Sequence, residues 1–286
     1  MKPSQYETMN APLGNDPLAR AKQYPYHAPP YSYLFVNGAD YEIAGFDEDP
    51  ILAGAIYVGR DMRPVGAVFQ ELGVPGAAAM DDRVPVIAHG SNAAPAQLAR
   101  KFAALYANGE ENVVIPVMRG RLVDHDVVYA PHFSGYGAMP ATLDVSPGTT
   151  AEIAVTYLTP DQLALMHGTE IFSANYVFGR LGKVTLELDG LETIDEAFAY
   201  LTLYGSAMLN DAPTALSAVK ARRRQFESAS TPAMLARARD HTAPGMALDA
   251  FIMENIENPA LRRERSGTLR QFARRPSFAA FDVLVG

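Results

Sequence analysis

The chain contains no cysteine among its 286 residues. Disulfide bonds, thiolate metal sites and a cysteine nucleophile are therefore excluded. No stretch reaches the roughly 18 consecutive apolar residues that a membrane-spanning helix needs. Residues 1–15 also lack the basic start and apolar run of a secretion signal. These absences predict a soluble protein of a reducing compartment, the cytoplasm, with no membrane partner.

Charged residues are sparse, at 20% of the chain, whereas hydrophobic residues make up 48%. This content is enough for one large domain, or for one domain with a smaller appendage. The net charge of −8 argues against nucleic acid as a partner. Residues 220–275 nevertheless hold 12 of the 24 Lys and Arg and only 6 of the 32 Asp and Glu. We interpret Arg222–Arg224 and Arg262–Arg263 as solvated helix faces, while noting that the stretch could face an anion.

The first eighty residues give few structural signals. Residues 1–30 are polar and contain prolines, which favours an extended arm. Residues 31–36 then alternate like a strand, and Asn37-Gly38 is a strong hairpin signal. A further strand is predicted at residues 66–69.

Strand and helix signals are clearer from residue 84 onward. Short apolar or alternating runs predict strands over residues 84–88, 113–117, 122–129, 141–143, 152–158, 176–181 and 184–188. Turns are predicted at Pro147-Gly148 and at Asp189-Gly190. Helical periodicity predicts helices over residues 96–102 and 160–167, then over 213–228, 231–240, 246–256 and 258–274. From residue 211 we expect no strands.

His89, Gly90, Ser91 and Asn92 lie between a predicted buried strand and a predicted helix. Such a turn can direct successive backbone N–H groups toward a carboxylate or a developing oxyanion, and glycine lets a ligand approach the backbone. The alternative is an ordinary turn in which Ser91 or Asn92 caps the following helix. The loop alone does not decide between the two.

Several segments in a fixed order resemble one family. Ile87 to Asn92 resembles the Tyr-Gly-Ser-Asn loop of the γ-glutamylcyclotransferase family, with His89 in place of the aromatic residue. The segments that continue the resemblance are residues 119–122, 141–143, 146–148, 154–159, 163–170 and 184–200. The resemblance covers residues 84–205 and leaves about eighty residues at each end without a counterpart.

The resemblance implies an α+β fold with a γ-glutamylcyclotransferase-like mixed α/β barrel core. We expect an N-terminal arm and extension over residues 1–80, the core over 81–208 and a helical C-terminal appendage over 209–286. The apolar face of Leu248, Phe251 and Ile252 needs a partner, so the appendage is expected to pack on the core.

The family's reaction releases 5-oxoproline from a γ-glutamyl amine or peptide. By resemblance, His89, Gly90, Ser91 and Asn92 form the substrate-binding loop and Glu170 is the general acid/base. Ring closure is intramolecular, so the enzyme needs a proton acceptor and oxyanion donors but no metal or cofactor. The expected partner is a small γ-glutamyl compound.

Other residues were weighed for the site. Phe133 and Tyr136 are possible pocket residues, although packing is an equally good interpretation. His125, His132 and His167 lack metal-ligand spacing, so no metal site is predicted.

Two alternatives stay open at this point. Glu170 taken alone is a surface glutamate at a helix end. The whole core is alternatively a non-catalytic ligand-binding or assembly module with the same cavity. An open pocket into which Glu170 points, beside residues 90–92, would favour the enzyme. A cavity filled by Tyr or Phe from the N-terminal arm would favour the module.

Overall fold

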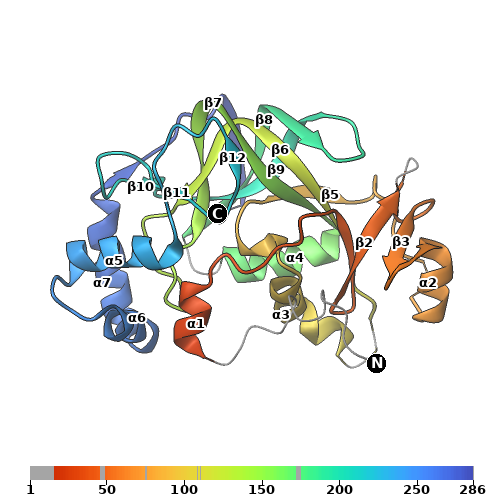
Figure 1. Ribbon diagram of the computed structural model, residues 1–286, viewed down its shortest axis with the longest axis horizontal. Helices are drawn as coiled ribbons and strands as arrows, with labels where there is room; N and C mark the ends of the chain where they lie inside the picture. Colours follow the sequence, from red (N-terminus) through yellow and green to blue (C-terminus); the bar gives the residue numbers. More distant parts are fainter. Residues whose placement is uncertain are drawn as a thin grey trace.

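A closed β-barrel forms the centre of the computed structural model, which describes residues 16–45, 49–74, 76–107, 109, 111–171 and 175–285 (Figure 1). The barrel strands are β5 (Val84–Ala88), β6 (Val114–Tyr129), β7 (Ala141–Leu158), β8 (Tyr176–Leu188) and β9 (Ile194–Thr202). Antiparallel pairs join β5 to β7, β7 to β6, β6 to β8 and β8 to β9, and a parallel pair between β9 and β5 closes the ring. The mixed α/β barrel predicted from the sequence is thereby confirmed.

Three barrel strands are longer than the sequence predicted. β6, β7 and β8 each join two predicted strands into one, and the predicted turn at Pro147-Gly148 lies inside β7. The register between β6 and β7 shifts around His125, and Asp124 and Gly148 have φ values of 59° and 81°. A bulge therefore absorbs the turn-like residues while the hydrogen bonding of the ladder continues on both sides.

The N-terminal segment adds strands to this sheet. β1 (Tyr33–Val36) pairs antiparallel with the start of β6, and β2 (Ala39–Gly45), β3 (Ala55–Val58) and β4 (Asp61–Pro64) follow outward. Asn37 and Gly38 both have positive φ, 47° and 94°, which confirms the hairpin.

Two expectations for the N-terminal segment were wrong. Residues 66–69 belong to a helix, α2 (Val65–Glu71), because Val65, Val68 and Phe69 are buried at helical spacing. The expected extended arm contains the short helix α1 (Pro17–Lys22), which Asp16 caps through a 2.9 Å bond from the Leu18 N–H.

The C-terminal segment combines helices with short strands. Helices α5 (Thr231–Thr242), α6 (Leu248–Glu257) and α7 (Pro259–Arg270) were predicted, and Asn258 caps α7 as expected. Short strands also occur: β10 (Ser206–Ala207) pairs with β14 (Ala273–Arg274), and β15 (Ala280–Val285) pairs with β8. The expectation of no strands after residue 211 was therefore wrong.

The predicted helix over residues 213–228 is absent from the described chain. Three short strands take its place: β11 (Ala215–Leu216), β12 (Ala221–Arg222) and β13 (Ser228–Ala229). β11 pairs with β6 and with β13, and β12 pairs with β7. The Arg224 guanidinium makes two bonds, of 2.9 and 3.0 Å, to the fully buried Asp126 carboxylate of β6. Pairing with the barrel thus satisfies this backbone and overrides its helical pattern.

Helices α3 (Pro95–Tyr106) and α4 (Pro160–Glu170) lie against one side of the barrel (Figure 1). Leu98 and Phe102 of α3 pack in one buried cluster with Leu158 of β7 and Met166 of α4. Each such fully buried side chain contributes about 1.5–3 kcal/mol through burial. Among the described residues, no helix is long and apolar enough to cross a membrane. The three-domain division stays a prediction.

Candidate functional site

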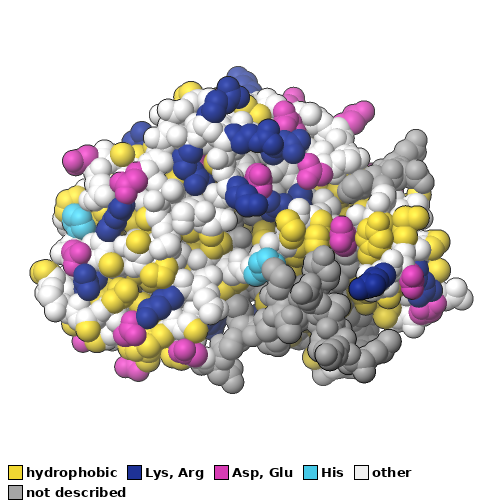
Figure 2. Space-filling model, in the orientation of Figure 1, with side chains coloured by type: hydrophobic (Ala, Val, Ile, Leu, Met, Phe, Trp, Pro, Cys, Tyr) yellow, Lys and Arg dark blue, Asp and Glu magenta, His cyan; other side chains and the backbone are white. Residues whose placement is uncertain are grey.

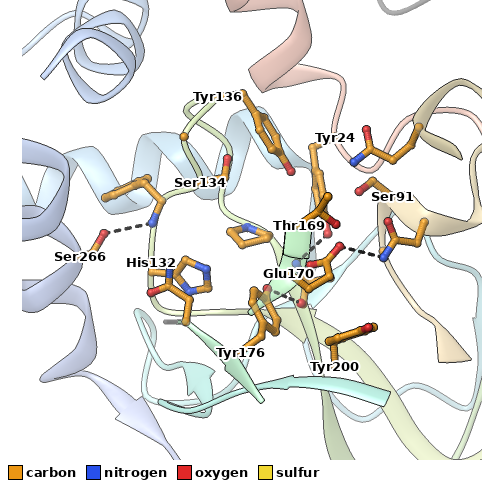
Figure 3. A pocket seen from close by; sticks show the side chains of 18 of the residues that line it. Tyr24, Ser91, His132, Ser134, Tyr136, Thr169, Glu170, Tyr176, Tyr200 and Ser266 are labelled. Atoms are coloured by element: carbon orange, nitrogen blue, oxygen red, sulfur yellow. Dashed lines mark hydrogen bonds between the residues drawn. The ribbon is translucent and has the colours of Figure 1, made fainter. Parts of the chain in front are cut away.

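A cavity of about 1290 Å³ opens beside one end of the barrel. The loop after β5, the end of α4 and residues 132–136 contribute to its wall, together with residues of β7, β8 and β9. Helices α1, α3, α6 and α7 also line it. In Figure 3, Glu170 points into this space, with Ser91 on one side of it and His132 and Ser266 on the other. Two parts of the chain that have no counterpart in the resembled family, α1 and α7, therefore enclose the same cavity as the predicted loop.

Glu170 is the last residue of α4. The helix begins with a capping box, in which the Gln162 N–H donates to Thr159 Oγ1 and the Thr159 N–H donates to Gln162 Oε1. At its other end, Glu170 Oε1 accepts a 3.0 Å bond from Asn92 Nδ2 and forms an ion pair with Lys101 Nζ. The Glu170 side chain is 21% exposed and the Lys101 side chain 3%. The structure thus brings Glu170 to the predicted loop, through Asn92.

The ion pair fixes the charge state of both partners. Burial alone would raise the pKa of the Glu170 carboxyl, but the Lys101 charge, with hydrogen bonds from Lys101 and Asn92, holds that pKa below its usual value. Burial lowers the pKa of the Lys101 ammonium, and Glu170 opposes this effect. At neutral pH the carboxylate is therefore ionised and able to accept a proton.

Lys101 was missed by the sequence analysis, although a signal for it exists. Gln97, Leu98, Lys101 and Phe102 form the buried face of α3 at helical spacing. A lysine on such a face needs a counter-charge or an acceptor, because an isolated buried ammonium is strongly unfavourable. Lys101 also donates 2.9 Å to Thr169 Oγ1, next to Glu170.

The loop does not cap a helix through its side chains. Residues 91–93 form a single turn of 3₁₀ helix, and α3 begins after Ala94 without a side-chain cap. The alternative in which Ser91 or Asn92 caps this helix is therefore wrong. Among the backbone bonds of turns and loops in the described chain, none is donated by the Ser91 or Asn92 N–H.

Tyr24, from the segment after α1, packs directly on the loop. Its hydroxyl accepts a 2.8 Å bond from the Ala141 N–H, and its carbonyl accepts 2.7 Å from Thr231 Oγ1 of α5. A Cβ atom at Gly90 would lie 2.5 Å from the Tyr24 hydroxyl oxygen. Gly90 has φ −124°, so the glycine is needed for this close approach and not for a left-handed backbone.

Four tyrosines surround Glu170 in the cavity lining: Tyr24, Tyr136, Tyr176 and Tyr200 (Figure 3). Burial raises the pKa of each hydroxyl, and the Glu170 charge adds to that rise. They remain neutral hydroxyls at physiological pH. Tyr176 Oη donates 2.9 Å to the Ala141 carbonyl, so Tyr24 and Tyr176 bind both backbone polar groups of Ala141.

The two possible pocket residues of the sequence analysis, Phe133 and Tyr136, both lie in the cavity lining. The Phe133 N–H donates 3.1 Å to Ser266 Oγ of α7, and its ring meets Phe251 edge-on at 5.5 Å. Phe133 therefore attaches the lining to the C-terminal helices. The described residues contain no group of three or more His, Asp or Glu that could hold a metal ion.

His89 is buried directly before Gly90, and its Nδ1 has no hydrogen-bond partner within the described structure. Burial lowers the pKa of His89 from 6.5 to about 4. The imidazole is therefore neutral at physiological pH and acts as a packed aromatic ring.

Replacing His89 by Phe is expected to reduce the acid sensitivity of the fold. The folded-state pKa lies below the unfolded value, so the stability from neutral His89 is complete above pH 6.5 and is lost as the pH falls toward 4. The parent should lose about 2 kcal/mol more unfolding free energy than His89→Phe between pH 7 and pH 5. Urea unfolding at both pH values measures this difference. Equal losses of unfolding free energy in the parent and in His89→Phe would show that folded His89 is protonated at pH 5 and that its pKa is not lowered.

Comparisons with known proteins give two distant likenesses. No protein family and no curated protein matches the chain. A solved structure titled gamma-glutamyl cyclotransferase shares 14% identity, with 62% of this chain and 87% of that one covered and a TM-score of 0.32. An uncharacterized protein from Homo sapiens shares 15% identity, with 62% and 88% covered and the same TM-score. Both similarities are distant.

Proposed function

We propose that the protein is a γ-glutamylcyclotransferase-like enzyme that releases 5-oxoproline from a γ-glutamyl amine or peptide. The observation that carries the proposal is the position of Glu170. Of the described residues that line the cavity, it bears the one carboxylate, and Lys101 and Asn92 hold it beside the residue 89–92 loop.

The chemistry needs one group that moves a proton. Glu170 takes a proton from the α-ammonium of the substrate's glutamyl part, and the freed amine attacks the γ-carbonyl carbon. The new C–N bond closes the five-membered ring. The bond to the leaving nitrogen then breaks as Glu170 returns the proton to that nitrogen. The surplus proton of the ring nitrogen passes by way of Glu170 to the released amine, which departs as an ammonium ion. No atom is gained or lost, and proximity is supplied by the substrate itself.

The loop supplies the groups that such a substrate needs. The N–H groups of Ser91 and Asn92 suit a carboxylate or the oxyanion, and the neutral Tyr24 and Tyr176 hydroxyls lie on the same wall. Incubating the protein with γ-glutamyl dipeptides and γ-glutamyl amines, and quantifying 5-oxoproline by mass spectrometry, tests the proposal. A failure to release 5-oxoproline from any of them would contradict it.

One observation favours the alternative, a ligand-binding module that does not catalyse. Tyr24 comes from the N-terminal arm and occupies the face of the loop at Gly90. The cavity nevertheless remains large, at about 1290 Å³, so Tyr24 lines the space without filling it. Binding of 5-oxoproline without turnover of any γ-glutamyl compound would favour the module.

Gly90→Val is expected to weaken 5-oxoproline binding by tenfold or more, because the new side chain must displace the Tyr24 hydroxyl. Ser91→Ala keeps its amide and loses only a hydroxyl, so we expect less than a fivefold change, about 1 kcal/mol. Calorimetric titration with 5-oxoproline measures both affinities, and melting temperatures control for folding. Unchanged affinity in a folded Gly90→Val variant would reject the loop as the binding site.

A further inference from the structure

The lining of the cavity is positively charged, although the whole chain has a net charge of −8. The lining has one carboxylate, Glu170, and six cationic side chains: Arg20, Arg100, Lys101, Arg262, Arg263 and Arg270. Lys101 pairs with Glu170. Within the described ranges, none of the five arginines forms an ion pair with a carboxylate.

Most described arginines outside the cavity form an ion pair with a carboxylate. On the face shown in Figure 2, basic and acidic side chains lie beside one another over the barrel and over the helices. The arginines with a carboxylate within 4 Å are Arg63, Arg119, Arg121, Arg180, Arg224, Arg237, Arg239, Arg265 and Arg274. Arg265 shows the contrast within one helix, because it belongs to α7 and pairs with Glu254 at 2.7 Å. Among the described residues, the arginines outside the cavity without an ion pair are Arg60, Arg83, Arg222, Arg223 and Arg275. The cavity is therefore distinguished by having five such arginines in one lining that holds a single carboxylate.

Neutral groups hold the arginines of the cavity in place. Arg270 of α7 donates 2.8 Å to Asn175 Oδ1, and its guanidinium lies 3.6 Å from the centre of the Tyr204 ring. Arg262 donates 2.6 Å to the Asn255 carbonyl. These contacts fix the guanidinium groups of Arg262 and Arg270, and no carboxylate of the described residues pairs with them, which is the arrangement that a bound anion needs.

Buried nitrogen atoms on this wall also lack partners. Among the described residues, Arg270 Nε and His132 Nδ1 are enclosed and make no hydrogen bond, and His132 is only 2% exposed. Burial lowers the pKa of His132 to about 3, and the Arg270 charge acts in the same direction, so the imidazole is neutral. Unpaired buried polar atoms are rare in folded proteins, and one at a site often marks a missing ligand.

We propose that the α7 side of the cavity binds an anionic group, a carboxylate or a phosphate, through Arg262, Arg263 and Arg270. The inference rests on the proposed function and deepens it: the substrate would carry its anionic group on the amine portion that is released. The His132 ring contacts Tyr176 edge-on at 5.4 Å, and Tyr176 lies within the field of the Glu170 carboxylate. A ligand can therefore extend from Glu170 past Tyr176 to Arg270.

The kinetic test compares three amine portions on the same γ-glutamyl group: aspartate, phosphoethanolamine and butylamine. The parent should show a KM at least tenfold lower for an anionic compound than for the butylamine compound. Arg263→Gln and Arg270→Gln should each move the ratio of those two KM values about tenfold toward one. Arg263 is exposed and makes no described polar contact, so its variant should fold normally. A lower KM for aspartate indicates a carboxylate ligand, and a lower KM for phosphoethanolamine indicates a phosphate.

Arg275→Gln is the matched control, because Arg275 is exposed and lies outside the cavity. The substitution removes the same unit of charge as Arg270→Gln. Its KM ratio should equal that of the parent. Equal KM values for charged and neutral compounds in the parent, or a ratio that Arg270→Gln leaves unchanged, would overturn the anion site while turnover itself upheld the proposed function.

Direct binding separates the two proposals when no turnover occurs. Inorganic phosphate and succinate are titrated calorimetrically into the parent, Arg270→Gln and Arg275→Gln. We expect both anions to bind the parent and Arg275→Gln with the same affinity, and Arg270→Gln about tenfold more weakly. This result would support the anion site even where no γ-glutamyl compound is converted. Absence of binding by both anions to the parent would reject the anion site when no γ-glutamyl compound is converted.

Discussion

Glu170→Gln is expected to release 5-oxoproline about 10² to 10⁴ times more slowly than the parent, which is the usual effect of losing a general acid/base. Glutamine keeps the size and the hydrogen-bonding shape of the side chain, and Asn92 can turn its amide to remain a partner. The substitution removes the proton acceptor. Initial rates with a γ-glutamyl substrate measure the effect, mainly in kcat.

Glu192→Gln provides the control, because Glu192 is exposed near the β8–β9 turn and lies outside the cavity. Its rate should equal that of the parent. A Glu170→Gln variant that keeps the parent rate would show that another group moves the proton. In that case the alternative in which Glu170 is an ordinary helix-end glutamate would regain support.

The barrel could be predicted from the sequence because its signals are local. Val84–Ala88 and Glu152–Leu158 show strand patterns, and Thr159-Pro160 marks the start of α4, which the capping box confirms. The closed barrel topology was expected from the resemblance of these segments, in their order, to the γ-glutamylcyclotransferase family. The failure at residues 213–228 has a physical cause, because pairing with β6 and β7 decides this segment and no local pattern encodes it.

The candidate site could be predicted only where one chain segment supplies it. The loop at His89–Asn92 and the position of Glu170 in a helix follow from nearby residues. Tyr24 meets Ala141 across 117 positions of sequence, so its role needed the tertiary fold. The same holds for Arg262 and Arg263, which the sequence analysis interpreted as a solvated helix face and the structure places at the cavity.

Glu170→Gln should also lower stability, which the sequence analysis did not anticipate. The substitution leaves the Lys101 ammonium, 3% exposed, without its counter-charge. Breaking a buried ion pair by removing one partner typically costs about 3–5 kcal/mol. The measured rate loss therefore has to be corrected for the folded fraction, which urea unfolding supplies.

The Lys101→Met/Glu170→Gln double variant tests whether the pair itself causes this loss. Removing both charges leaves no buried ion, so the double variant should be about 2–4 kcal/mol more stable than Glu170→Gln while remaining as inactive. A full cycle with Lys101→Met gives the coupling free energy of the pair. Additive effects of the two substitutions would show that Lys101 and Glu170 are not coupled in solution.

Lys101→Met alone is expected to shift the pH dependence of turnover. The Lys101 charge is the largest of the influences that hold the pKa of Glu170 below its usual value against the opposing effect of burial. Without the ammonium, burial acts with little opposition, the pKa rises, and the carboxylate protonates at higher pH. The acid limb of the kcat/KM profile should therefore move to higher pH. An acid limb at the same pH in both proteins would mean that the group titrating there is not Glu170, since no other carboxylate lines the cavity among the described residues.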